Sequence, residues 1–63
     1  MALPNPRTDP VEYREAVAAR LTEANRLFRT GNMTVAVYQA TLYSLGMRGH
    51  TIETETNLNW PKV

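Results

Sequence analysis

The stretch that decides the fold is VAVYQATLYSLGM, residues 35–47, which carries no charged side chain. On a helix that turns about 100° per residue, its apolar side chains form two stripes. The first stripe contains Val35, Tyr38, Leu42 and Leu45, and the second contains Ala36, Ala40, Tyr43 and Met47. A surface helix of a globular protein needs only one apolar face. The pattern therefore predicts a helix over residues 34–48 that packs on its own chain with the first stripe and on another surface with the second.

A longer helix is predicted before it, over residues 9–30. Asp9 is a favourable N-cap, Pro10 suits the first helical position, and Glu12 completes a capping-box pattern. The apolar positions recur every three or four residues and form one stripe of Tyr13, Val17, Leu21, Ala24 and Phe28. Gly31 can take the left-handed conformation that ends a helix, and the short connection makes the two helices neighbours. We expect an antiparallel hairpin in which this stripe packs against the first stripe of the following helix.

The spacing of the apolar side chains changes in residues 50–60. The even positions are His50, Ile52, Thr54, Thr56, Leu58 and Trp60, and all but one of the apolar and β-branched side chains of the segment lie among them. A two-residue alternation of this kind is typical of a strand, and threonine and isoleucine favour strands. The sequence contains no second strand of comparable quality. The segment is therefore predicted to be either an extended tail or a strand that pairs with another chain.

The first eight residues contain Pro4 and Pro6, which disfavour a helix and favour an extended path. Residues 1–8 are predicted to form an extended arm. It is either a flexible leader or an arm that lies along a neighbour with Leu3 as its anchor. The predicted fold is thus mainly α: one small domain over residues 1–63, made of a two-helix antiparallel hairpin, an extended N-terminal arm and a strand-like C-terminal tail.

The composition restricts how so short a chain can be stabilised. A domain of 63 residues buries only about 60% of the surface that its unfolded chain exposes. The absence of cysteine removes disulfides and thiolate metal sites, so oligomerisation or docking on a larger partner is the remaining common solution. A net charge of +1 does not indicate a polyanionic partner.

No apolar run has the length of a signal peptide's core or of a membrane span. We therefore expect a protein that is not secreted by a signal peptide and has no membrane partner. The expected location is the cytoplasm or the interior of a macromolecular assembly, for which a virion is one candidate.

The sequence carries no motif for catalysis, cofactor binding or a metal. It contains neither a glycine-rich phosphate loop nor a nucleophile elbow. His50 is the sole histidine, and Glu53 and Glu55 would alternate away from it in a strand. We expect a protein without enzymatic activity, and therefore without catalytic residues, a metal, a cofactor or a small-molecule substrate.

Two helices joined by a glycine-containing turn are also typical of helix-turn-helix DNA-binding proteins. A recognition helix places Arg, Lys, Asn or Gln against base edges and phosphates. The helix predicted over residues 34–48 offers Gln39 alone, with Arg48 at its end. Nucleic-acid binding is therefore the least favoured of the binding functions.

Several apolar side chains have no partner within the predicted fold: Ala36, Ala40, Tyr43, Met47, Ile52, Leu58 and Trp60. Tyrosine, methionine and tryptophan are enriched at protein interfaces. We expect these residues to form a protein interface. The leading hypothesis is a structural or assembly component of a homo-oligomer or a larger complex, such as a phage particle. Two alternatives are a small inhibitor or regulator that docks on a host enzyme, and a nucleic-acid-binding accessory protein.

Overall fold

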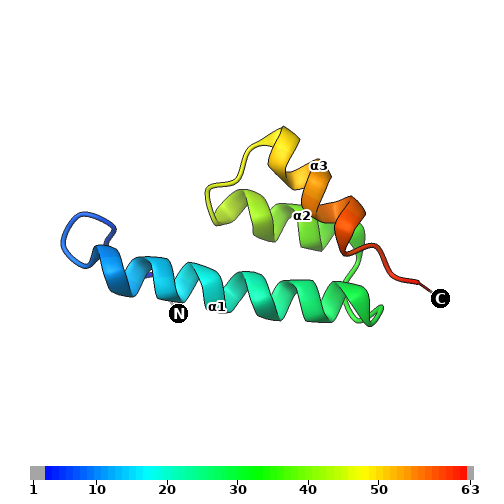
Figure 1. The fold of residues 1–63 in the computed structure, drawn as a ribbon, viewed down its shortest axis with the longest axis horizontal. Coiled ribbons are helices and arrows are strands. Elements are labelled where there is room, and N and C mark those ends of the chain that lie inside the picture. The colour runs from blue at the N-terminus through cyan, green and yellow to red at the C-terminus, as the bar shows by residue number, and fades with distance from the viewer. Residues whose placement is uncertain (1–2, 63) are drawn as a thin grey trace.

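The computed structural model describes residues 3–62, which form three helices (Figure 1). These are α1 (Pro10–Arg29), α2 (Val35–Ser44) and α3 (Gly49–Leu58). α2 runs back along α1, and it contacts both α1 and α3. The mainly helical fold class is confirmed, whereas a third helix takes the place of the predicted strand-like tail.

α1 begins and ends within one residue of the predicted bounds. Pro10 occupies its first turn, and Glu12 lies near the positive end of the helix dipole. Asp9 is the N-cap by position, but its side chain makes no capping hydrogen bond. Its Oδ2 instead accepts a hydrogen bond from Thr8 Oγ1 at 3.3 Å. The predicted capping through the Asp9 side chain is therefore wrong.

The segment before α1 turns instead of remaining extended. Asn5 Oδ1 accepts a hydrogen bond from the Arg7 amide at 2.8 Å, and the Asn5 carbonyl accepts one from the Asp9 amide at 2.8 Å. An asparagine that bonds the backbone two residues later stabilises a turn. The predicted extended arm is thus wrong for residues 5–8, while its residues 1 and 2 lie outside the described chain.

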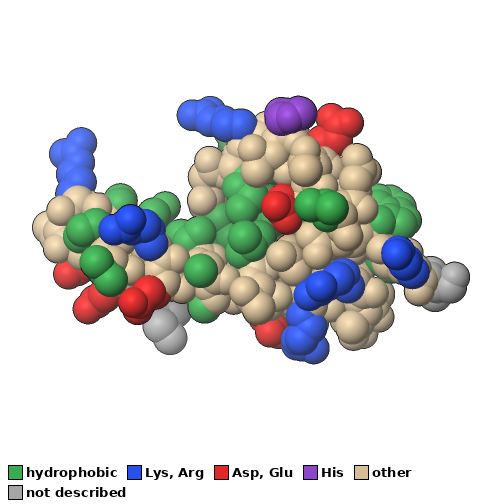
Figure 2. All heavy atoms as spheres, in the orientation of Figure 1, with side chains coloured by type: hydrophobic (Ala, Val, Ile, Leu, Met, Phe, Trp, Pro, Cys, Tyr) green, Lys and Arg blue, Asp and Glu red, His purple; other side chains and the backbone are tan. Residues whose placement is uncertain are grey.

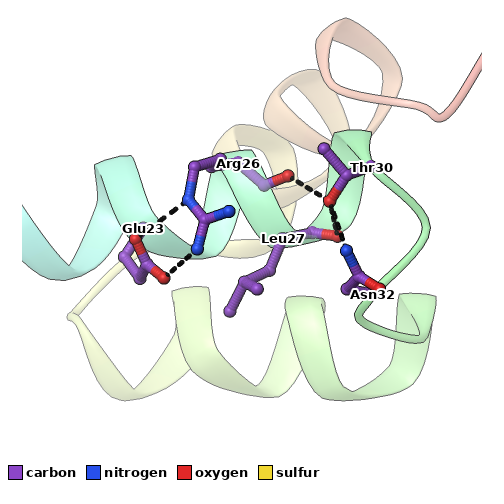
Figure 3. A network of polar contacts seen from close by, with 5 residues as sticks. All are labelled: Glu23, Arg26, Leu27, Thr30 and Asn32. Carbon is purple, nitrogen blue, oxygen red and sulfur yellow. Dashed lines mark hydrogen bonds and ion pairs between the residues drawn. The ribbon is translucent and has the colours of Figure 1, made fainter.

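A Schellman motif ends α1. Gly31 has a φ of +78°, as expected, and its amide donates to the Phe28 carbonyl at 3.1 Å. The Asn32 amide donates to the Leu27 carbonyl at 2.8 Å, which completes the pattern. In Figure 3, the Thr30 hydroxyl donates to the Arg26 carbonyl and accepts from Asn32 Nδ2, each at 2.9 Å. These bonds satisfy carbonyls at the helix end.

The same motif ends α2 earlier than predicted. Gly46 has a φ of +93°, and its amide donates to the Tyr43 carbonyl at 3.0 Å. The Met47 amide donates to the Leu42 carbonyl at 3.2 Å. A residue in the position of Met47 commonly makes an apolar contact with the residue in the position of Leu42. Met47 accordingly lies outside the helix and packs against the core cluster that contains Leu42.

The predicted strand over residues 50–60 is wrong, because α3 occupies this segment. Ile52 and Thr56 share a face in a strand and also in a helix, since a spacing of four residues satisfies both periods. The helix places Asn59 on this face as well, and both Thr56 and Asn59 are buried. The Thr56 hydroxyl donates to the Ile52 carbonyl at 2.6 Å, so this β-branched side chain satisfies its polar atom within the helix.

The core lies where α2 meets the second half of α1. Its buried apolar residues are Ala24, Phe28, Tyr38, Leu42 and Leu45, with Leu21, Met33, Met47 and Ile52 partly buried around them. The Phe28 and Tyr38 rings stack with their centroids 4.2 Å apart. In the first stripe of α2, the burial of three residues agrees with the prediction, whereas Val35 at the start of the helix remains exposed.

A polar chain joins the three helices through one tyrosine. Tyr38 Oη donates to Asn25 Oδ1 of α1 at 2.6 Å, and Asn59 Nδ2 donates to Tyr38 Oη at 3.2 Å. Asn59, the C-cap of α3, also donates to the Glu55 carbonyl at 2.9 Å. Burial raises the pKa of Tyr38, and the hydrogen bond from Asn59 opposes that shift. The chain fixes the end of α3 relative to both other helices.

Candidate protein-binding surfaces

The exposed side of α2 forms an uncharged surface. It consists of Ala36, Val37, Ala40 and Tyr43, and we call it the α2 face. α1 and α3 cover the side of α2 that carries Tyr38 and Leu42, whereas Val37 is 52% and Tyr43 is 70% exposed. α2 contains no Asp, Glu, Lys or Arg. Covering this face would therefore desolvate no charged side chain of α2.

The hydroxyl groups beside the α2 face are already hydrogen bonded within the helix. Thr41 Oγ1 donates to the Val37 carbonyl at 2.8 Å, and Ser44 Oγ donates to the Thr41 carbonyl at 2.7 Å. Gln39 instead bonds to α3, through Nε2 and Thr56 Oγ1 at 3.4 Å. Burying a polar group costs little when its hydrogen bond is kept. The α2 face is therefore suited to a dry contact with another protein.

The structure divides the predicted interface residues among three places. Ala36, Ala40 and Tyr43 lie together on the α2 face. Met47 and Ile52 are half-buried and pack on the core. A shallow hollow of about 220 Å³, lined by Tyr43, Gly46, Met47 and Arg48, joins the end of the α2 face to Met47. Leu58 and Trp60 lie elsewhere, at the end of α3.

Leu58 and Trp60 line a second surface, which we call the carboxyl-terminal hollow. It is an open depression of about 330 Å³ whose lining also includes Arg29 and Lys62. Leu58 is 72% exposed and Trp60 is 54% exposed. The Trp60 ring meets Phe28 edge-on, with centroids 5.7 Å apart and planes at 89°, which holds it against α1. Figure 2 shows hydrophobic and basic side chains side by side at this end of the molecule.

Three residues of these surfaces were not among the predicted interface residues: Val37, Arg29 and Lys62. Val37 belongs to neither of the two predicted stripes, although an apolar residue in an uncharged helix is a sufficient signal for an apolar surface. Arg29 and Lys62 come from the end of α1 and from beyond α3, and both line the same hollow as Trp60. No spacing in the sequence indicates that they share a surface, since the helical path of residues 49–58 is what places Lys62 there.

The described residues place no cluster of chemically reactive groups on either surface. His50 is exposed on α3, and across residues 3–62 no three His, Asp or Glu side chains come together as a metal site. No helix in that range combines the length and the apolar composition needed to cross a membrane. Comparison of the chain with family models, curated proteins and solved structures finds no match. The proposed function therefore rests on the α2 face and the carboxyl-terminal hollow.

Proposed function

We propose that this chain is a non-enzymatic structural subunit that binds protein through the α2 face. One observation carries the proposal: the exposed side of α2 is uncharged and presents Tyr43 at 70% exposure. Tyrosine supplies a large apolar area with a polar tip, and it is enriched at protein interfaces. The proposed setting is a homo-oligomer or a larger assembly, with a virus particle as one candidate.

The proposed partner at the α2 face is a second copy of the chain. A two-fold contact brings the same patch of both copies together, so any charge on the patch would meet itself. The α2 face avoids this repulsion because its residues are uncharged. Ala36 and Ala40 lie one turn apart, and such small side chains allow two helices to approach closely. Tyr43 of each copy would then supply most of the apolar area at one end of the contact.

Sedimentation equilibrium of the wild-type chain and of Tyr43→Asp tests the proposal. The wild type is expected to associate as its concentration rises, and Tyr43→Asp is expected to associate more weakly because it introduces a charge that the contact must desolvate. Circular dichroism should show the same helical content in both. Thr22→Asp, on the exposed side of α1, is the matched control and should associate like the wild type.

Association of Tyr43→Asp equal to that of the wild type would overturn the proposal, and so would either of two further results. One is a wild-type chain that remains a monomer at every concentration measured. The other is equal weakening of association by Tyr43→Asp and by Thr22→Asp, which would reflect charge alone and not the position of Tyr43.

A further inference from the structure

The two ends of the molecule carry charged side chains beside apolar ones. The described chain is 42 Å in its longest dimension. Near the start of α1, the sequence places the acidic Asp9, Glu12 and Glu15 together with the basic Arg7 and Arg14, and Figure 2 shows both kinds of side chain at that end. At the opposite end, the carboxyl-terminal hollow is lined by Arg29 and Lys62. The acidic side chains at the start of α1 are therefore complementary in charge to the basic lining of the hollow.

The lining of the carboxyl-terminal hollow indicates which side chains would bind in it. Leu58 and Trp60 are both more than half exposed and would be covered by an apolar side chain. Arg29 and Lys62 would be matched by carboxylates beside that side chain. Arg29 Nε donates to the Asn25 carbonyl at 3.3 Å, which ties the guanidinium group to the last turn of α1. The expected occupant is therefore an apolar residue flanked by acidic residues.

The first turns of α1 have this chemistry. Val11 is 58% exposed, Glu12 follows it directly, and Glu15 lies one turn later on the same side of the helix. Arg14 lies on the other side of Val11, where its Nε donates to the Pro10 carbonyl at 3.4 Å. Arg7 belongs to the turn that precedes the helix. The carboxylates of Glu12 and Glu15 thus lie on the side of Val11 away from Arg14.

We propose that the first turns of α1 in one copy dock in the carboxyl-terminal hollow of another copy. Val11 then covers Leu58 and Trp60, and the carboxylates of Glu12 and Glu15 face Arg29 and Lys62. The contact joins two different patches, so a row of copies always retains one free patch of each kind, one at each of its ends. Copies therefore assemble head to tail. This inference rests on the proposed role as an assembly subunit, but it uses none of the residues of the α2 face.

The test uses Tyr43→Asp as the parent chain, so that contacts through the α2 face do not contribute. Sedimentation velocity at low ionic strength should show species that grow with concentration. Lys62→Glu and Glu15→Lys, each added to this parent, should each weaken association on the order of tenfold, because like charges then meet. An equimolar mixture of the two variants should recover association, since each reversed charge meets its complement.

Matched controls apply the same charge changes away from both ends. Arg20→Glu and Glu53→Lys, on exposed positions of α1 and α3, should leave association near that of the parent. A parent that stays monomeric at low ionic strength would overturn the head-to-tail contact. Failure of the mixture to recover association would also overturn it. Equal association of the wild type and Tyr43→Asp would count only against the α2 face, so the two proposals fail separately.

Discussion

Two tyrosines five positions apart on α2 have opposite environments. Tyr38 is 0% exposed, stacks on Phe28 and bonds to Asn25 and Asn59, whereas Tyr43 is 70% exposed. Both lie in the same short helix, whose uncharged sequence does not distinguish one side from the other. The difference arises because α1 and α3 cover only one side of α2. Burial at this helix is therefore decided by the neighbours of each side and not by its residue types.

The largest effect that separates the two sides of α2 is expected from Leu42→Ala. Leu42 is fully buried within the core cluster, so its truncation removes apolar contacts and leaves a cavity. The free energy of unfolding should fall by about 2–5 kcal/mol. Val37→Ala, on the α2 face, is the control and should change it by less than about 0.5 kcal/mol. Urea denaturation followed by circular dichroism measures both, and similar losses would refute the division into a core side and an exposed side.

A smaller effect is expected from removing one hydroxyl group. Tyr38→Phe removes the hydrogen bonds to Asn25 Oδ1 and from Asn59 Nδ2, and it should cost about 0.5–1.5 kcal/mol because Asn59 Nδ2 keeps the Glu55 carbonyl as an acceptor. Tyr43→Phe removes a hydroxyl group from an exposed ring and should leave the free energy of unfolding nearly unchanged. The same denaturation measurement compares the two variants. Equal stability of both would mean that the polar chain between the helices contributes nothing.

The smallest expected effect is a dependence of stability on alkaline pH. Burial raises the pKa of Tyr38 in the folded chain above its unfolded value of about 10. As the pH rises past that unfolded value, the unfolded chain loses the phenolic proton before the folded chain does, so the free energy of unfolding falls. This contribution is complete below the unfolded pKa and is lost as the pH rises through the folded pKa. Denaturation from neutral to alkaline pH should show the loss in the wild type and less of it in Tyr38→Phe.

Local signals were sufficient to predict the first two helices. Pro10 and the stripe that ends at Phe28 gave the bounds of α1, and Gly31 ended it as expected. The 3.6-residue period also placed Ala36, Ala40 and Tyr43 on one surface. These features depend on residues within a few turns of each other, where the helical period alone determines which side chains lie together.

The third helix could not be predicted from the same signals. The spacing of Ile52 and Thr56 fits both a helix and a strand, and the abundance of threonine favoured the strand. The buried position of Asn59, at an odd-numbered site, distinguishes the two structures, but its partner Tyr38 is far away in the sequence. The membership of Lys62 in the carboxyl-terminal hollow depends on the same helix. The wrong prediction for this one element thus also concealed the basic part of the carboxyl-terminal hollow.

The edge contact between Trp60 and Phe28 gives the molecule an intrinsic optical reporter. Trp60 is the sole tryptophan of the sequence, and it lies just beyond α3 against a ring of α1. Its indole emission therefore reports on one junction, where the segment after α3 meets the end of α1. Detachment of α3 would move the indole ring from an aromatic neighbour into water. Fluorescence can follow that event in the unlabelled chain, separately from the loss of helix elsewhere.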